Sequence, residues 1–458
     1  MKIKLPDEVN KAIKTLESSG YEAYAVGGGV RDSLMGLAPN DWDVCTSALP
    51  EQAMKCFEGM RIIETGVKHG TITVIINHRH IEVTTYRTDG VYSDNRRPDT
   101  VEFVRDLKED LSRRDFTVNA LAYHPERGLA DYFGGEEDIK NKIIRCVGDA
   151  DRRFGEDALR IMRALRLASI FNFDIAPETS EAIFRNKGLL QNISEERVAA
   201  ELNRLITGEG AGPVLLCYAN VISEVLPEIL PMTGYGMNGY DPGLYGHGPG
   251  ARTDIWVHTA LSVACAPADK AVRLAMLFHD SAVPLCNTPR SPDARFHDHP
   301  AMGAELAKAA LSRLKYDNET IGAVSQLVLC HESHIGADRV SVKRWLNKIG
   351  EKRLRQLIEA IKADAAALPD EPGKVKYEAA ANVIPVIGDI IGQRECFHMK
   401  DLAVNGFDIM EAGARGKKIG EILDRLLDMV ISEQVANDKA ELLKIAYIVG
   451  RGDPDAPF

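Results

Sequence analysis

The chain has 458 residues, of which 45% are hydrophobic and 27% are charged. This length allows roughly three or four domains, the composition is that of a soluble globular protein, and no apolar run reaches the length of about 18 residues that a membrane-spanning helix needs. The net charge of −11 argues against a protein that coats nucleic acid through charge alone, although an acidic body can still carry a local basic track.

The first twenty residues lack the apolar core of a secretory signal and have the spacing of an amphipathic helix. We therefore expect a cytoplasmic protein. The eight cysteines are scattered from Cys45 to Cys396 and form no CxxC pair. In a reducing cytosol we expect them to be buried thiols, neither disulfides nor zinc ligands.

Strand and helix signals alternate through residues 1–150. The β-branched runs at 70–76 and 80–86, separated by a short polar turn, predict a hairpin, and residues 142–148 predict a further strand. From residue 151 onward the apolar spacing is helical. The sequence therefore predicts an α+β protein, with a small α/β head that contains a mixed or antiparallel sheet, followed by all-helical domains.

Two breaks interrupt the helical part. Residues 233–251 contain seven glycines and two prolines, which no helix tolerates, and PDEPGK (369–374) forms a second break. The expected domains are a head at 1–150, a helical neck at 151–235, a helical domain at 250–368 and a helical tail at 375–458.

The segment YAVGGGVRDSLMGLAPNDWDVCTS (24–47) carries the first chemical signal. An apolar strand runs into three glycines and then a helix, a turn at which backbone amides approach an anion, with Arg31 as a phosphate clamp. Asp41 and Asp43 are separated by one residue. In a strand their side chains share a face, where two carboxylates repel unless a cation such as Mg²⁺ lies between them. Taken alone, the glycines also fit any tight turn, and two acids fit a solvated loop.

A glycine-rich turn followed by DxD resembles the DNA polymerase β-like nucleotidyltransferase superfamily. The segments EVTTYRTDGVYSDNRRPDTVEFV (82–104), EDLSRRDFTVNALAY (109–123) and FGEDALRIMRALRLA (154–168) follow in the order typical of class II tRNA nucleotidyltransferases, the CCA-adding enzymes. The resemblance implies that C, C and A are transferred from CTP and ATP to the 3′ end of tRNA, with release of pyrophosphate and with Mg²⁺ bound at the catalytic pair Asp41 and Asp43.

The resemblance also implies a set of nucleotide-binding residues: Gly28, Arg31, Arg114, Asp115, Asn119, Asp157, Arg160, Arg163 and Arg166. Taken by itself, the segment that contains Arg114 and Asp115 also fits a solvated helix cap with an ion pair between these two residues. Glu82 lies on a strand beside the DxD segment and is a candidate third metal ligand. An ordinary cross-strand polar residue is the alternative for Glu82.

The family assigns base selection to Asp157 and Arg160, on a helix where they form one stripe with Arg163 and Arg166. A carboxylate accepts from the amino group of cytosine or adenine, and a guanidinium donates to the adjacent ring acceptor, whereas uracil and guanine present a carbonyl there. Arg163 and Arg166 would then bind phosphate or RNA. The alternative is a surface stripe of ion pairs, worth roughly a few tenths of a kcal/mol. A further family motif is expected to brace this helix with Glu196, Arg197 and Glu201.

Seven of the twelve histidines lie between His247 and His334. Within this part, the residues that match the H…HD…D pattern of HD phosphohydrolase domains are His258, His279, Asp280 and Asp364. The segments FHDHPAMGAELA (296–307) and CHESH (330–334) resemble the HD-containing branch of the family. Such ligands suit a second, transition metal.

The HD pattern has one departure here, because Val283 stands where the usual HDIGKP motif has lysine. A missing cation weakens stabilisation of a phosphate transition state, which favours metal binding without hydrolysis. A protein whose principal activity is hydrolysis of RNA phosphoesters is the alternative from another class.

The segment 402–427 resembles the RNA-binding tail of the family, with Lys417 and Lys418 as candidate phosphate contacts. Two solvated lysines at a helix start are the alternative. The loop at 88–100 resembles the flexible loop of full CCA-adding members, which favours CCA addition over CC-only addition, A-only addition or poly(A) synthesis. The expected partners are tRNA, CTP and ATP, with no membrane and no obligate protein partner.

Overall fold

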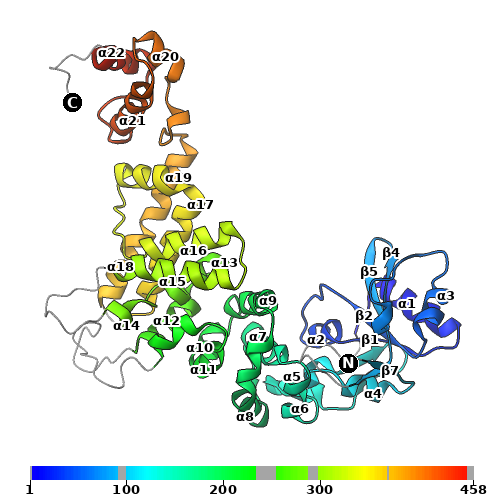
Figure 1. Cartoon of the computed structure of the whole chain (residues 1–458). Coiled ribbons are helices and arrows are strands. Elements are labelled where there is room, and N and C mark those ends of the chain that lie inside the picture. The colour runs from blue at the N-terminus through cyan, green and yellow to red at the C-terminus, as the bar shows by residue number, and fades with distance from the viewer. Residues whose placement is uncertain (1–2, 91–99, 234–253, 287–297, 369–370, 451–458) are drawn as a thin grey trace. The chain divides into compact units, whose positions relative to one another are not determined.

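The structure is a computed structural model that describes residues 3–90, 100–233, 254–286, 298–368 and 371–450. The chain divides into two compact units (Figure 1). The first comprises Met1–Thr233 and Arg313–Tyr316, and the second comprises Gly234–Ser312 and Asp317–Phe458. All strands of the described chain lie in the first unit, so the predicted α+β class is confirmed, while the division into four domains stays a prediction. Most of the loop predicted at 88–100 and of the break predicted at 233–251 falls outside the described residues.

A seven-stranded mixed sheet forms the head. Its order is β3-β4-β5-β2-β1-β8-β9, in which β2 and β5 pair in parallel and the other neighbours are antiparallel. The strands are β1 (Ala23–Val26), β2 (Asp43–Thr46), β3 (Arg61–Ile63), β4 (Thr71–Ile76), β5 (Arg79–Thr85), β8 (Leu121–His124) and β9 (Gly128–Asp131). Two short pairs lie outside this sheet: β6 (Arg87–Asp89) with β7 (Val101–Phe103), and β10 (Ile143–Ile144) with β11 (Asp174–Ile175).

The predicted hairpin is confirmed, because β4 and β5 pair from one end to the other around Asn77 and His78. Both turn residues have positive φ angles, 47° and 65°, as a two-residue turn of type I′ requires. The prediction of a strand over 142–148 is wrong about its length. Only two of its residues form β10, because their partner strand β11 is itself two residues long.

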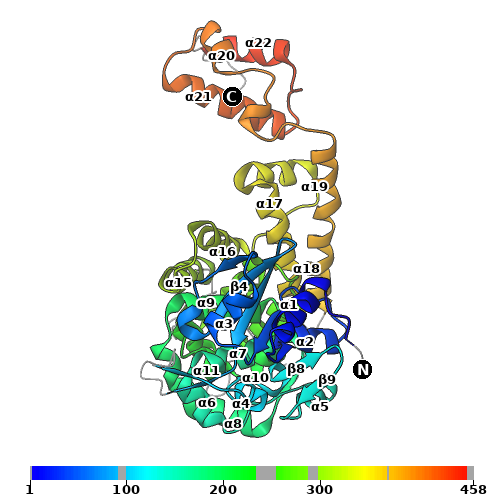
Figure 2. The ribbon, with the colours of Figure 1, turned by 90° about the vertical axis from the view of Figure 1, so that its right-hand side faces the viewer.

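The central strands bury both of their faces. Helix α1 (Asp7–Ser18) lies on one face (Figure 2). It packs through Val9 and Ile13 onto a cluster that includes Val44, which confirms the amphipathic helix predicted at the N-terminus. On the other face, Cys45 joins a second apolar cluster with α4 (Leu107–Ser112). Because side chains alternate along a strand, Asp43 projects to the same face as Cys45.

The glycine-rich turn joins β1 to α2 (Gly28–Leu34). Gly27 precedes the helix with φ 72°, a backbone conformation that glycine adopts readily. Gly29 has no room for a side chain, since a Cβ there would lie 2.9 Å from the Trp42 ring and 3.0 Å from the backbone oxygen of Asp41. The absence of a side chain at Gly29 thus lets the turn pack directly against the segment that carries the two aspartates.

Helices make up the rest of the first unit. They are α3 (Pro50–Cys56), α5 (Gly135–Asn141), α6 (Ala150–Glu156), α7 (Leu159–Phe171), α8 (Pro177–Asn186), α9 (Glu195–Ile206), α10 (Ala211–Cys217) and α11 (Ala219–Ile222), with 3-10 turns η1 (Val67–His69), η2 (Thr117–Asn119), η3 (Lys187–Asn192) and η4 (Pro227–Met232). Helix α7 lies against α9. This contact positions the stripe of arginines that the sequence singled out.

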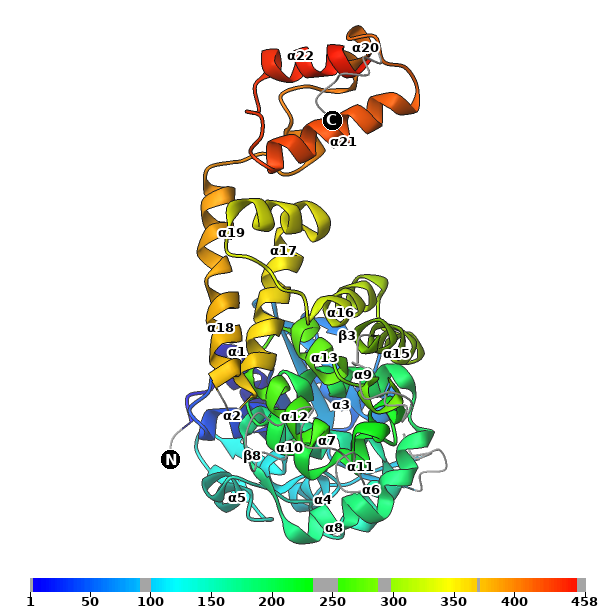
Figure 3. The same ribbon diagram turned by 90° about the vertical axis from the view of Figure 1, so that its left-hand side faces the viewer.

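The second unit is helical throughout its described residues. Its helices are α12 (Ile255–Cys265), α13 (Lys270–Phe278), α14 (Val283–Cys286), α15 (His299–Arg313), α16 (Asn318–Cys330), α17 (Arg339–Ala366), α18 (Glu371–Ala381), α19 (Val383–Gly392), α20 (Gly406–Glu411), α21 (Lys417–Ile431) and α22 (Lys439–Gly450), with η5 (Met399–Asp401). Helix α17 bends at Gly350 and lies along α18 and α19 (Figure 3). The break predicted at 369–374 is shorter, because α18 starts at Glu371. Helices α20 to α22 share an apolar cluster of their own.

All eight cysteines are free thiols. Cys217 and Cys265 are exposed, so the predicted burial is wrong for these two. Of the helices that the structure describes, none is both long enough and apolar enough to cross a membrane.

Replacing Gly29 with alanine should destabilise the first unit, because the new methyl group would overlap the Trp42 ring. Overpacking of this kind costs about 1–3 kcal/mol. The midpoint of urea denaturation measures the loss. Gly155→Ala is the matched control, since an added Cβ there meets no atom within 4 Å. If the two variants are equally stable, the turn has room for a side chain and the close packing does not fix the aspartates.

Candidate functional site

One pocket of the first unit, with a volume of about 370 Å³, brings together all the predicted nucleotide-binding residues and Asp43. The residues that line it are Gly27, Gly28, Arg31, Asp43, Arg113, Arg114, Asp115, Asn119, Asp157, Arg160, Arg163 and Arg166. The six arginines outnumber the three aspartates, so an acidic chain carries a locally basic pocket. Gly27 and Arg113 are additions to the predicted set, and each is the immediate neighbour of a predicted residue.

Three carboxylates converge at the start of β2. Asp43 pairs with Glu82 in the parallel ladder between β2 and β5, so both side chains project to the same face of the sheet. Asp41 precedes β2, so the prediction that both aspartates lie on one strand is wrong. Burial, together with the charges of Glu82 and Asp41, raises the pKa of Asp43 to about 6, although Arg114 opposes the shift. Such crowded negative charge fits a hard divalent cation.

A chain of polar contacts crosses the pocket from α2 to α7. Arg31 Nη1 donates to Asn119 Oδ1 at 2.5 Å, and Asn119 Nδ2 donates to Asp115 Oδ1 at 3.2 Å. Arg163 donates two hydrogen bonds to Asp115 Oδ2, at 2.8 and 2.5 Å. Burial alone would raise the pKa of Asp115, but the guanidinium groups of Arg163 and Arg160 hold it well below its ordinary value. Asp115 therefore stays ionised and fixes Arg163 in place.

Arg114 occupies the corner between the glycine turn and the carboxylates. Its Nη2 lies 3.4 Å from Asp110 Oδ2, so the alternative in which Arg114 pairs with Asp115 is wrong. A Cβ added at Gly27 would lie 3.2 Å from Arg114 Nη1 and 3.8 Å from Asp43 Oδ2. The turn, the guanidinium and the carboxylate therefore meet at one point of the pocket.

Asp157 lies between α6 and α7 in an extended conformation, with φ −136° and ψ 103°. The sequence predicted that Asp157 lies on one helical stripe with the arginines, and this prediction is wrong. Its Oδ2 accepts from Arg197 Nη2 at 3.0 Å, and its Oδ1 accepts from the Leu159 backbone N–H at 3.1 Å. Each carboxylate oxygen has two lone pairs, so the restrained side chain keeps acceptor capacity.

The arginines of α7 are not a solvated surface stripe. Arg160 and Arg166 are only 8% and 7% exposed, which excludes that alternative. Arg160 Nη1 donates to Glu156 Oε2 at 2.6 Å, and Arg166 Nε lies 2.5 Å from Glu201 Oε2. The predicted bracing role thus holds for Arg197 and Glu201. The carboxylate of Glu196 pairs with Lys315 at 2.8 Å, and its bracing role stays a prediction.

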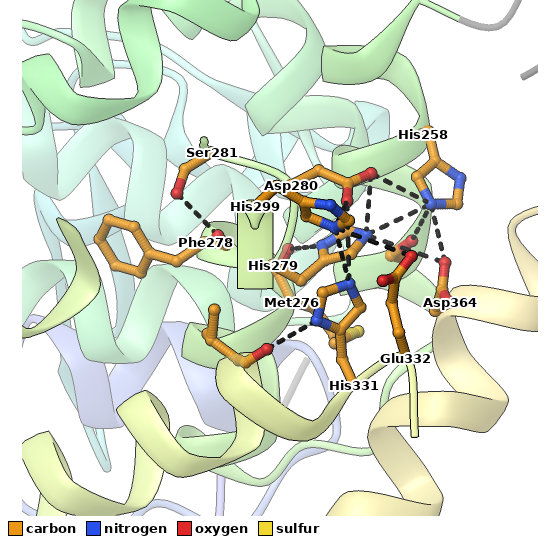
Figure 4. Close-up of polar contacts among 12 residues, drawn as sticks. His258, Met276, Phe278, His279, Asp280, Ser281, His299, His331, Glu332 and Asp364 are labelled. Atoms are coloured by element: carbon orange, nitrogen blue, oxygen red, sulfur yellow. Dashed lines mark hydrogen bonds and ion pairs between the residues drawn. The ribbon is translucent and has the colours of Figure 1, made fainter. Parts of the chain in front are cut away.

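The second unit brings together the four residues of the predicted HD pattern (Figure 4). His258 Nε2 lies 2.9 Å from Asp364 Oδ1, 3.3 Å from His279 Nε2 and 3.9 Å from Asp280 Oδ2. Two further histidines, His299 and His331, complete the cluster. The sequence signal for both is the resemblance of segments 296–307 and 330–334 to the HD-containing branch, a signal that identifies no individual ligand.

Lys417 and Lys418 are exposed at the start of α21, which follows Gly416. This position is compatible with a phosphate contact and equally with two solvated lysines. The contact of these lysines with tRNA phosphates therefore stays a prediction.

Three family matches follow one another along the chain. Residues 23–145 match the poly(A) polymerase head domain, residues 172–232 match the RNA and SrmB-binding site of polymerase A, and residues 299–446 match the tRNA nucleotidyltransferase domain 2. The first match contains the carboxylates and the glycine turn. The third contains α15 to α21 of the second unit.

Some similar proteins cover nearly the whole chain and others cover about half of it. The CCA-adding enzyme of Geobacillus stearothermophilus is 34% identical over 436 residues, which is 94% of each chain, and that of Lactobacillus helveticus is 48% identical over 229 residues, 49% of this chain and 57% of that one. The crystal structure of the Bacillus stearothermophilus CCA-adding enzyme in complex with CTP superposes with a TM-score of 0.68, at 30% identity and 97% coverage of both chains. The chain therefore belongs to the family of CCA-adding enzymes, the tRNA nucleotidyltransferases.

Proposed function

We propose that this enzyme adds C, C and A in sequence to the 3′ end of tRNA, using CTP and ATP and releasing pyrophosphate. The observation that carries the proposal is the single pocket that unites a carboxylate of the DxD pair, the arginines beside the glycine turn, and the Asp157–Arg160 pair. A nucleoside triphosphate needs these three functions at once. The relative that superposes along 97% of its chain was solved with CTP. With tRNA as substrate, the enzyme would act in the cytoplasm.

The proposed Mg²⁺ ligands are Asp41 and Asp43, with Glu82 as a third. Burial and the mutual repulsion of these carboxylates raise the pKa of Asp43, and a divalent cation would relieve the repulsion. When bound there, Mg²⁺ would favour deprotonation of the attacking 3′ hydroxyl and stabilise the negative charge of the leaving pyrophosphate. The role of these side chains is to hold that charge at the start of β2, beside the glycine turn.

The proposed triphosphate site comprises Gly28, Arg31 and Arg114. Arg31 is already restrained, since it contacts Asp32 at 2.6 Å, Asn119 at 2.5 Å, and the Phe171 ring at 4.6 Å from the ring centroid. A cation held in place before binding loses less side-chain freedom when it meets phosphate. Asn119 and Asp115, which continue the same chain of contacts, are proposed to face the ribose.

The proposed base reader is Asp157 with Arg160. Asp157 is oriented by Arg197 and by a backbone N–H, which leaves lone pairs for the amino group of cytosine or adenine. Arg160, whose Nη1 donates to Glu156 Oε2, is proposed to donate to the neighbouring ring acceptor of the base. A uracil or guanine carbonyl facing Asp157 would leave a buried acceptor unpaired at a cost of about 1–3 kcal/mol. Arg163 and Arg166 would contact phosphate or RNA, and Lys417 and Lys418 would contact tRNA phosphates.

The direct experiment uses the full chain with Mg²⁺, each nucleoside triphosphate singly, and tRNA that lacks CCA, lacks only the final A, or is complete. Sequencing of the products should find two C residues added to the first RNA and one A added to the second, with the complete tRNA unchanged. Arrest after CC, addition of A alone, or a run of A residues would identify a partial enzyme or a poly(A) polymerase.

Asp41→Asn and Asp43→Asn should each reduce both C and A addition by at least about 10³-fold, because both steps use one metal site. Binding of tRNA should stay within a few fold, as a filter-binding assay measures. Glu58→Gln, an exposed carboxylate on the same domain, is the control. Retention of A addition by either aspartate variant would contradict a single site.

Asp157→Ala should relax base choice more than it weakens triphosphate binding. It removes the acceptor that rejects carbonyls, so UTP incorporation relative to CTP should rise about tenfold or more, in line with about 1–3 kcal/mol. Competition assays with mixed CTP and UTP measure the ratio. The matched control is Asp151→Ala, an exposed aspartate that pairs with Arg185. An unchanged ratio in Asp157→Ala would remove Asp157 from base selection.

A further inference from the structure

Asp110 of α4 is a carboxylate that lies behind the nucleotide pocket without lining it. Its side chain is completely buried, and its helix contributes Leu107 and Leu111 to an apolar cluster of the head. A buried charge is costly unless it is paired and hydrogen-bonded. The partners of Asp110 therefore indicate why the chain carries a charge at this position.

Both oxygens of Asp110 accept hydrogen bonds from arginines that line the pocket. Oδ1 accepts from Arg113 Nε at 3.0 Å and from Arg113 Nη2 at 2.9 Å, and Oδ2 accepts from Arg114 Nη2 at 3.4 Å. The arginines follow at i+3 and i+4, so one helical turn brings both to the same carboxylate. Burial alone would raise the pKa of Asp110, but the two guanidinium groups hold it below its ordinary value. Asp110 therefore stays ionised and binds both arginines.

The ionised carboxylate keeps two like charges together. Guanidinium groups on neighbouring residues repel each other, and the negative charge of Asp110 between them offsets this repulsion. One carboxylate compensates only one of the two guanidinium groups, so the three side chains together keep a net positive charge for an anionic ligand. Without the carboxylate, the repulsion would drive Arg113 and Arg114 apart and away from their present positions.

Arg114 connects Asp110 to the glycine turn. Its Nη2 contacts Asp110, while its Nη1 lies 3.2 Å from the position that an added Cβ would take at Gly27. Asp43 Oδ2 lies 3.8 Å from that same position. One end of the planar guanidinium is thus held by Asp110, and the other end lies at the proposed triphosphate site.

The backbone around Asp110 is held by other parts of the first unit. Arg153 Nη2 donates to the Ser112 carbonyl oxygen at 2.9 Å, which ties the end of α4 to α6. Asp110 Oδ1 also accepts from the Arg87 backbone N–H at 3.2 Å, which ties α4 to β6. Because the backbone is fixed in this way, the direction of the Arg114 side chain depends on its contact with the carboxylate.

We propose that Asp110 is the positioning residue of the triphosphate site, which directs Arg113 and Arg114 toward the phosphate groups of CTP or ATP. The inference rests on the triphosphate site proposed above. Asp110 does not line the pocket, so it acts through the two arginines. A buried ion pair adds little net stability compared with an apolar replacement, so a positioning role accounts for this charge better than a stabilising role does.

The test measures nucleotide binding by the full chain with Mg²⁺, using isothermal titration calorimetry without tRNA. Asp110→Asn removes the charge and nearly preserves the volume. It should weaken binding of CTP, ATP and inorganic tripolyphosphate about tenfold, as expected for the loss of a charge-assisted contact. The ratio of CTP to UTP incorporation and the affinity for tRNA should not change, because the base reader is intact. A change in these two quantities that matches the loss of tripolyphosphate binding overturns the positioning role.

Two controls lie on the same helix. Glu109→Gln replaces an exposed carboxylate and should bind CTP like the unsubstituted chain. Leu107→Ala removes a buried apolar side chain and should lower the midpoint of urea denaturation without weakening tripolyphosphate binding. If Leu107→Ala weakens that binding as much as Asp110→Asn does, a loosened helix explains both effects and the proposal is wrong.

Variants of Arg114 test whether Asp110 acts through this side chain. Arg114→Ala should weaken CTP binding about tenfold or more, and adding Asp110→Asn should cause a smaller further loss than Asp110→Asn alone. Arg114→Lys keeps the charge, but its single terminal nitrogen cannot contact Asp110 and a phosphate as a guanidinium does. It should therefore bind CTP nearly as weakly as Arg114→Ala.

The outcomes separate this inference from the proposals on which it rests. Unchanged CTP binding in Arg114→Ala removes the triphosphate site and the inference together. Normal binding in Arg114→Lys, or factors that simply multiply in the double variant, overturn the role of Asp110 alone. Arg114→Lys remains decisive if Asp110→Asn does not fold. Since binding is measured without tRNA, the result is independent of whether the enzyme completes CCA.

Discussion

The ion pair between the buried Asp115 and the partly exposed Arg163 is the contact on which the nucleotide pocket depends. Asp115 belongs to the head and is only 8% exposed, while Arg163 belongs to α7, so the charge of one part of the first unit is compensated by another. Removing one partner of such a pair leaves an uncompensated buried charge, which costs far more than an exposed pair contributes. Asn119 extends the network to Arg31. The network thereby fixes the phosphate side of the pocket relative to the base side.

The residues of this pocket were predictable from the sequence because their chemistry is concentrated in short motifs. Their geometry was not predictable from the sequence. Helical spacing placed Asp157 on a stripe with Arg160. Asp157 instead accepts from the Leu159 N–H, a local contact by which aspartate competes with helix formation, and its other oxygen is bound by Arg197, 40 residues further along. The spacing of residues within the 154–168 motif cannot predict Arg197, which lies outside that motif.

In the fold, too, some features are set by residues adjacent in sequence and others by distant partners. The β4–β5 hairpin follows from β-branched runs and a two-residue turn, all of it adjacent in sequence. By contrast, the 142–148 segment contributes only β10, because its length is set by pairing with β11, some thirty residues away. Asp41 also falls outside its predicted strand. It lies in the segment whose Trp42 packs against Gly29, a contact that strand propensity does not encode.

The histidine cluster carries this reasoning one step further, because there the sequence motif itself was incomplete. The H…HD…D pattern locates four residues, yet the cluster also contains His299 at the start of α15 and His331 in the turn after α16. The lysine missing at Val283 has a counterpart in Lys376, nearly a hundred residues later and on a different helix, whose Nζ lies 2.5 Å from Asp364 Oδ2. A motif records sequence positions, whereas the positive charge beside a buried carboxylate can come from any part of the chain that the fold brings there.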